Sequence, residues 1–195
     1  MVNMIFYHPA EITYGGTSGS QVRPVRILDA FKNIGCNVVE VTGLYHKRRE
    51  KIRDKIIGKK FDLFYGENSN MPLLLSNKYK LPWVGIFDKL LFEYIKENSI
   101  PSGLFFRDIY WVFDFYKKTA PLHRRMYKPL RYYELFFYRK YIDILFLPTN
   151  RMANYLPLNW PQKNVYPLPP GVKQERNYNN KHINKKEEFK LLYVG

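Results

Sequence analysis

Residues 14–24 read Tyr-Gly-Gly-Thr-Ser-Gly-Ser-Gln-Val-Arg-Pro, from Tyr14 to Pro24, and form a glycine-rich connection between an expected strand and an expected helix. It follows a short apolar run at 4–7 and leads into apolar residues at helical spacing from Val22 onward. Such a loop lets a backbone approach a ligand closely, and the N–H groups of a helix N-terminus attract anionic groups or sugar hydroxyls. Its spacing is not that of a dinucleotide site or a P-loop, so a flexible strand-to-helix connection is the alternative.

Apolar, β-branched runs alternate with helical patterns along most of the chain, which predicts a parallel sheet with helices on both faces. The expected fold class is therefore α/β and Rossmann-like. We expect strands at 4–7, 37–42, 61–65, 81–87, 104–107, 143–148 and 165–168. We expect helices at 22–34, 46–60, 72–77, 89–98 and 150–156, with Asp88 capping the helix that follows it.

The composition points to one basic domain. A chain of 195 residues fits one substantial domain and is too short for two complete ones. Its formal net charge of +15 predicts an anionic partner, such as nucleic acid, a membrane surface or a phosphate-bearing substrate. The single cysteine, Cys36, excludes an internal disulfide framework and fits a reducing compartment. Since no signal peptide or spanning run is evident, we expect a cytoplasmic protein.

The last part of the chain changes character. Residues 172–188 are polar and lack periodicity, as in a linker, and 189–195 read as a new strand. A lone strand after a linker has nothing to pair with. We therefore expect one domain at 1–171, a linker at 172–188, and the first strand of a truncated second domain at 189–195.

Three further motifs follow the glycine-rich loop. Residues 102–111 read SGLFFRDIYW, residues 168–172 read LPPGV, and residues 191–195 read LLYVG. In this order the motifs resemble the N-terminal half of a family 4 glycosyltransferase, the retaining group of the GT-B fold. The chain is most similar to bacterial members found with capsule and surface-polysaccharide genes, and the resemblance covers essentially all of it.

In that family, two Rossmann-like domains face each other across a cleft, and the N-terminal one binds the acceptor. The resemblance implies that Gly15, Gly16 and Thr17 border the cleft near the phosphates of the nucleotide-sugar donor. It implies that Arg107 and Asp108 lie beside the reacting sugar, with Arg107 in the place of a histidine found in many members. The paired glutamates that hold the donor belong to the other half, and no metal is expected. The isolated histidines, which suggest no metal site, are His8, His46, His123 and His182.

Several candidate site residues also have simpler interpretations. Ser18 belongs to the phosphate loop, and Arg23 could anchor a phosphate or merely be exposed in the first helical turn. Glu67 is placed to hold acceptor hydroxyls, with a solvated turn carboxylate as the alternative. Arg107 and Asp108 could form a structural ion pair, or Asp108 could cap the next helix. The glycine-rich loop, Glu67 and the pair Arg107 and Asp108 fall at predicted carboxyl ends of strands, where open α/β sheets bind ligands.

Residues 111–141 combine large aromatic side chains with many cations, and Glu134 is the only acidic residue after Asp114. Such a segment is typical of a helix that lies in an anionic membrane interface. The alternatives are a core helix with solvated charges and, less favoured, a nucleic-acid surface. Two prolines split the segment, so we expect its helix at 130–141. The cations expected at the membrane surface are Arg124, Arg125, Lys128, Arg131, Arg139 and Lys140.

These observations lead to one functional hypothesis and one alternative. By resemblance, the complete protein transfers a hexosyl group from a nucleoside diphosphate sugar to a lipid-linked or polysaccharide acceptor at the inner face of the membrane. Catalysis would rest on positioning and electrostatic stabilisation of the departing diphosphate, and residues 1–195 alone would be inactive. The alternative is a non-catalytic basic α/β module that binds nucleic acid or an anionic membrane.

Overall fold

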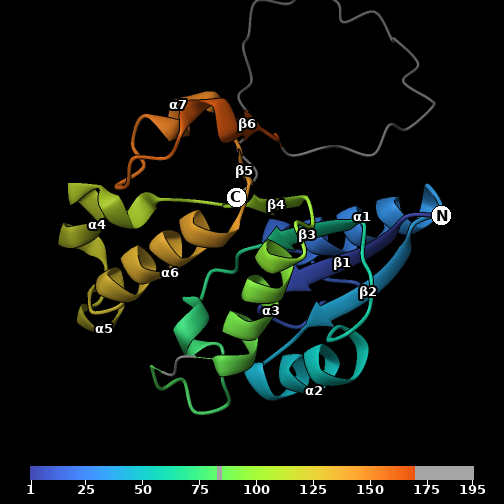
Figure 1. The fold of residues 1–195 in the computed structure, drawn as a ribbon. Coiled ribbons are helices and arrows are strands. Elements are labelled where there is room, and N and C mark those ends of the chain that lie inside the picture. The colour runs from blue at the N-terminus through green and yellow to red at the C-terminus, as the bar shows by residue number, and fades with distance from the viewer. Residues whose placement is uncertain (83–84, 170–195) are drawn as a thin grey trace, which may run out of the picture.

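The protein has a six-stranded, all-parallel β-sheet flanked by helices, in a computed structural model that describes residues 1–82 and 85–169 (Figure 1). This confirms the predicted Rossmann-like α/β fold. The strand order is β2-β1-β3-β4-β5-β6. The strands are β1 (Asn3–His8), β2 (Asn37–Thr42), β3 (Leu63–Glu67), β4 (Ser102–Phe105), β5 (Ile144–Leu147) and β6 (Val165–Pro167).

Helices connect the strands, as parallel pairing requires. The first helix ends where the sequence predicts, because Gly35 adopts the left-handed φ of +86° that a helix C-terminus favours. Short 3₁₀ turns lie at Leu73–Leu75, Tyr110–Val112 and Gln162–Asn164. The α-helices are α1 (Gly19–Asn33), α2 (Tyr45–Lys55), α3 (Ile86–Glu97), α4 (Asp114–Thr119), α5 (Leu122–Arg125), α6 (Lys128–Tyr141) and α7 (Asn150–Ala153).

The side chains of β1 alternate between two hydrophobic clusters, one on each face of the sheet. Ile5 and Tyr7 join the larger cluster, to which α2, α3 and α6 contribute, and Met4 and Phe6 join the smaller one, to which α1 contributes. All four side chains are fully buried. A strand that is covered on both faces reads as a continuous apolar run, which explains why the sequence signal of β1 is clear.

The strand predicted at 81–87 is wrong for its described residues, since 81, 82 and 85 lie in no strand and 86–87 are helical. Helix α3 begins at Ile86, and Asp88 lies inside its first turn, where it binds other side chains instead of capping the helix. Leu81 is 64% exposed, so it is not part of a buried strand. A short apolar run cannot be assigned to strand or helix by periodicity alone, and here the apolar spacing of the following residues continues the helix.

Most other boundaries agree with the predictions to within about two or three residues. The helix predicted at 46–60 ends at Lys55, and the one predicted at 72–77 is a short 3₁₀ turn at Leu73–Leu75. The predicted linker at 172–188 and the strand at 189–195 lie outside the described residues. Within the part of the chain that the structure describes, no helix is long and apolar enough to cross a membrane.

Candidate functional site

A cleft of about 600 Å³ lies at the carboxyl ends of the central strands. The strand order puts a topological switch point between β1 and β3, because the chain leaves β1 on one side for β2 and returns on the other for β3. Ligands of open α/β sheets bind at such points. The cleft is lined by residues that follow β1, β3 and β4 and by parts of α1, α4, α5 and α6, including His8, Ser20, Gln21, Ser69, Asn70, Arg107, Asp108, Tyr116, Arg124 and Arg131.

Arg107 connects the segments that form the cleft. Its backbone N–H donates to Oδ1 of Asn68 at 2.8 Å, and Nη1 donates to Oδ1 of Asn70 at 3.1 Å. Nη2 points to the backbone oxygen of Ser20, 3.4 Å away, at the start of α1. Burial lowers the pKa of Arg107, but a guanidinium stays charged at physiological pH. Arg107 thus lies two residues beyond the end of β4, on the cleft wall, and its role at the reacting sugar stays a prediction.

Asp108 and Arg131 are charged groups of the cleft with unused hydrogen-bonding atoms. Arg131 is 3% exposed, and Nη2 donates to the backbone oxygen of Asn70 at 2.6 Å and to the Tyr110 hydroxyl at 3.2 Å. Oδ1 of Asp108 and Nε of Arg131 are buried without a partner among the described residues. Burial raises the pKa of Asp108, while Arg131 and Arg107 oppose that shift. Unsatisfied polar atoms are rare in protein interiors, and in a cleft they favour a polar ligand.

His8 ends β1 at the cleft and is 3% exposed. Its Nδ1 lies 2.9 Å from the backbone oxygen of Ala10, and its Nε2 is buried with no partner in the described part of the chain. Burial lowers the pKa of His8 to about 4, so the ring is neutral near pH 7. When Nδ1 donates its proton to Ala10, Nε2 can accept a hydrogen bond from a ligand hydroxyl. The sequence analysis did not identify His8 as a site residue. Its position directly after the expected strand at 4–7 is the signal that could have identified it.

The glycine-rich loop borders the cleft through its two ends. Thr13, Ser20 and Gln21 contribute to the lining, whereas the tip at 15–18 is largely exposed. Gly15 has a left-handed φ of +80°, which explains a glycine at that position. The predicted phosphate loop therefore lies beside the cleft, with the start of α1 as its nearest part.

Glu67 ends its strand as the sequence predicts, but neither Glu67 nor Arg23 lines the cleft. Glu67 is fully buried in the last position of β3, and Oε1 accepts a hydrogen bond from the Tyr65 hydroxyl at 3.0 Å. Nε of Arg23 lies 3.2 Å from Oε1 of Glu67, an ion pair without hydrogen-bond geometry, and the Arg23 guanidinium lies over the Phe105 ring at 3.6 Å. Both side chains stabilise the packing of α1 on the sheet. The roles of Glu67 in acceptor binding and of Arg23 in phosphate binding are corrected accordingly.

The aromatic and basic segment divides into a core helix and a separate exposed part. Helix α6 buries Leu135, Phe137 and Tyr138 against the sheet, which supports the core alternative for this face. Arg131 is a buried residue of the cleft, so its assignment to a membrane surface is wrong, and Arg124 also lines the cleft. The remaining cations predicted at that surface, which are exposed or half-buried, are Arg125, Lys128, Arg139 and Lys140.

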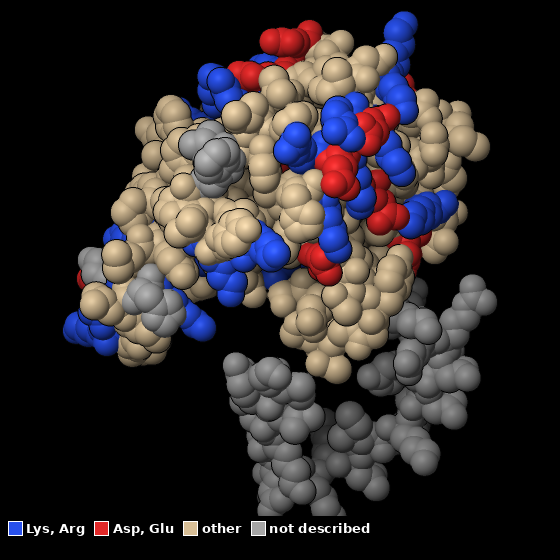
Figure 2. Space-filling view, turned by 90° about the horizontal axis from the view of Figure 1, so that it is seen from below, with Lys and Arg blue, Asp and Glu red and all other residues tan. Residues whose placement is uncertain are grey.

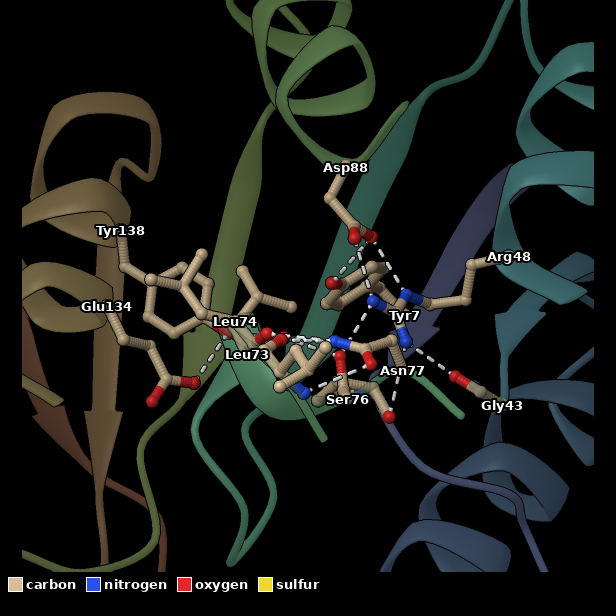
Figure 3. Close-up of polar contacts among 12 residues, drawn as sticks. Tyr7, Gly43, Arg48, Leu73, Leu74, Ser76, Asn77, Asp88, Glu134 and Tyr138 are labelled. Atoms are coloured by element: carbon tan, nitrogen blue, oxygen red, sulfur yellow. Dashed lines mark hydrogen bonds and ion pairs between the residues drawn. The ribbon is translucent and has the colours of Figure 1, made fainter. Parts of the chain in front are cut away.

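A second buried arginine, Arg48 of α2, was missed by the sequence analysis (Figure 3). Nε and Nη2 donate to the two carboxylate oxygens of Asp88 at 2.8 and 2.7 Å, and Nη2 also donates to Oγ of Ser76 at 2.9 Å. Nη1 donates to the backbone oxygens of Gly43 and Pro9. Since these groups follow β2, β1 and β3, Arg48 fixes the segments that carry the cleft residues.

The comparisons with known proteins leave the family resemblance to rest on the motifs alone. The chain matches no family model, no curated protein and no solved structure. Among residues 1–82 and 85–169, no group of three or more His, Cys, Asp or Glu side chains is placed to hold a metal ion.

Proposed function

We propose that this domain is the acceptor-binding half of a retaining GT-B glycosyltransferase that acts in cell-surface polysaccharide synthesis. It would direct a sugar from a nucleoside diphosphate sugar to a lipid-linked or polysaccharide acceptor. In this proposal the donor is held mainly by a second domain, as in the family that the sequence resembles. The proposal rests on that resemblance and on the cleft.

The observation that carries the proposal is the chemistry of the cleft lining. Three arginines, Arg107, Arg124 and Arg131, line a cleft in which Asp108 and His8 hold buried polar atoms without partners in the described chain. Cations suit the phosphates of a sugar nucleotide or of a lipid-linked acceptor. A carboxylate and a neutral imidazole suit sugar hydroxyls, because both can accept hydrogen bonds.

The roles of the residues follow from their positions. Arg107, fixed by the loop after β3, stabilises negative charge that develops on the departing diphosphate. Asp108 accepts a hydrogen bond from a hydroxyl of the sugar that reacts, and Ser20 and Gln21 bring the positive end of the α1 helix dipole to the cleft wall. The Arg48 network acts from outside the cleft, through the segments that it holds.

The test is a transfer assay on the complete protein made from its whole coding sequence. It is incubated with bacterial membranes and a panel of radiolabelled nucleoside diphosphate sugars, and the label in lipid and polysaccharide fractions is counted. We expect transfer from one donor and a loss of about a hundredfold in Asp108→Asn, the cost of removing one charged contact from a transition state.

Asp54→Asn is the matched control, because Asp54 is an exposed carboxylate of α2 that pairs with Arg53. Its activity should equal that of the wild type. Absence of transfer from every donor by the wild-type protein would overturn the enzyme proposal and leave the basic binding module. Equal losses in both variants would remove Asp108 from the site.

A further inference from the structure

Helices α4 and α5 carry large apolar side chains on the outside of the molecule. Phe115 is 76% exposed, Leu122 is 73% exposed and Met126 is 70% exposed. Leu122 and Met126 are four residues apart, so they share one face of the turn. We call residues 114–126 the α4–α5 hairpin; it protrudes beside the N-terminal end of α6 (Figure 1). Leu122 and Met126 therefore form an exposed apolar pair, and Phe115 adds a third exposed large apolar side chain in the same short segment.

The charge of the hairpin is almost entirely positive. In sequence, residues 114–126 contain Lys117, Lys118, Arg124 and Arg125 against the single acidic residue Asp114. Figure 2 shows the contrast with another part of the surface: basic residues predominate at the left, where α4 and α5 lie, whereas blue and red alternate on the right. A mixed surface needs no anionic partner, but an apolar patch among cations is complementary to an anionic bilayer interface.

The same two helices form part of the cleft wall. Tyr116 and Arg124 line the cleft, whereas Phe115 and Leu122 of the same two helices are exposed and do not line it. The Tyr116 hydroxyl donates to the backbone oxygen of Arg124 at 3.3 Å, and Nε of Arg125 donates to the backbone oxygen of Ala120 at 2.8 Å. The hairpin is therefore held as one unit with an apolar outer side and a cleft-facing side.

We propose that the α4–α5 hairpin docks in an anionic bilayer and that the cleft takes the phosphate-bearing head of a membrane amphiphile. The inference rests on the proposed function, and it selects the lipid-linked acceptor over the polysaccharide. The cleft arginines bind the phosphates, and the apolar tail leaves past the hairpin into the bilayer. A free polysaccharide would make no use of this apolar patch, which adjoins the cleft.

The first experiment measures docking without any sugar donor. The protein is sedimented with vesicles of phosphatidylcholine alone and of phosphatidylcholine with a minority of phosphatidylglycerol. We expect partition to the anionic vesicles and a loss of at least about tenfold in the double variant Leu122→Ser, Met126→Ser, because two apolar anchors are removed. The matched control is Ile34→Ser, Leu81→Ser, which changes two exposed side chains (75% and 64%) outside the hairpin.

The second experiment measures the affinity of the cleft for two probes, farnesyl diphosphate and inorganic pyrophosphate. Binding is followed by calorimetry in the presence of the same anionic vesicles. We expect Arg124→Ala to weaken the binding of both probes by about tenfold, the value of one charged contact. The double variant Leu122→Ser, Met126→Ser should weaken the binding of farnesyl diphosphate and leave the binding of pyrophosphate unchanged. Arg26→Ala, which removes an exposed cation of α1, should change neither.

The following results would contradict the proposal. Equal partition of the hairpin variant and the wild type would place docking elsewhere, and no partition to any vesicle would exclude a membrane. If pyrophosphate binds as tightly as farnesyl diphosphate, the cleft takes soluble phosphates. Self-association lost in the hairpin variant, without vesicle binding, would identify a second copy of the chain as the partner. Because neither experiment involves transfer, failure of the glycosyltransferase assay leaves these results interpretable.

Discussion

Two buried arginines, Arg48 and Arg131, show opposite degrees of hydrogen bonding. Arg48 uses all three guanidinium nitrogens, in five hydrogen bonds to Asp88, Ser76 and two backbone carbonyls. Arg131 leaves Nε unpartnered within the described chain, and the nearby carboxylate of Asp108 leaves Oδ1 in the same state. The first arginine lies among α2, α3 and the loops, and the second lines the cleft.

Taken together with the place of Arg131 and Asp108 on the cleft wall, this difference favours a structural role for Arg48 and a binding role for the other two residues. A buried polar atom without a partner costs about 1–3 kcal/mol, so a fold that leaves several in one place loses stability there. Such a loss is expected at sites that a ligand completes. We therefore infer a structural role for Arg48, and we propose that a ligand would supply the missing partners of Arg131 and Asp108.

The largest expected effect on stability is at Arg48, whose three guanidinium nitrogens are all hydrogen-bonded. Arg48→Met leaves Asp88 as an uncompensated buried charge, and we expect a loss of about 3–5 kcal/mol of unfolding free energy. For a domain of this size that lowers Tm by roughly 6–20 °C, measured by thermal or urea unfolding. Arg53→Met is the control on the same helix, since Arg53 forms an exposed pair with Asp54. If the two variants unfold alike, the structural role of Arg48 is wrong.

The next effect concerns Glu134, a fully buried neighbour of Arg131 whose Oε2 has no partner among the described residues. Burial raises the pKa of Glu134 from 4.5 to about 7, although Arg131 opposes the shift. Between these values the folded protein holds a proton that the unfolded chain has released, so stability falls as the pH rises. The shift corresponds to about 3 kcal/mol between pH 4.5 and pH 8.

Glu134→Gln should remove the decrease in unfolding free energy between pH 4.5 and pH 8. Urea unfolding at a series of pH values measures this decrease in the wild type and in the variant. The variant retains an oxygen for the Tyr138 hydroxyl, which donates to Oε1 of Glu134 at 3.1 Å. Glu50→Gln, on the exposed side of α2, should keep the wild-type pH profile. An unchanged slope in Glu134→Gln would show that this carboxylate is ionised and satisfied in the folded state.

The smallest effect on stability is expected at Arg107. Its side chain makes two hydrogen bonds, one of them long, so Arg107→Ala should cost no more than about 1.5 kcal/mol. Binding of pyrophosphate should fall by about ten- to a hundredfold, because a charged contact is lost. Calorimetric titration and a melting curve on the same sample test both statements. A large fall in Tm with unchanged binding would move Arg107 to the structural group.

The sequence predicts the fold because its strands are continuous apolar runs, and the position of Arg107 and Asp108 follows directly from β4. It was less informative about charged residues on helices. Arg48 stands among many cations, yet it lies four residues before Ile52 and eight before Ile56, on the apolar face of α2. The same spacing places Asp88 with Leu91, Phe92 and Ile95, and Arg131 and Glu134 with Leu135 and Tyr138.

The signal for buried charges is therefore a charged residue at an apolar position of a helical pattern. It shows that a charge is buried, but it cannot show which partner the charge has, because the partner comes from a distant element. Glu67 illustrates the same limit on a strand. Its position at a carboxyl end predicted access to ligand, and only the packing of Arg23 from α1 shows that it is covered.

The strand order also determines how the sheet can assemble during synthesis. Once β1, β2 and β3 have paired, each later strand joins the edge left by the strand just before it, in the order β4, β5 and β6. No formed pair has to open to admit a later strand. Parallel pairing is slow because every pair closes a long crossover, but here the nascent chain can add strands at the pace of translation. After the first three strands, each new edge strand thus becomes available in the order in which the chain is translated.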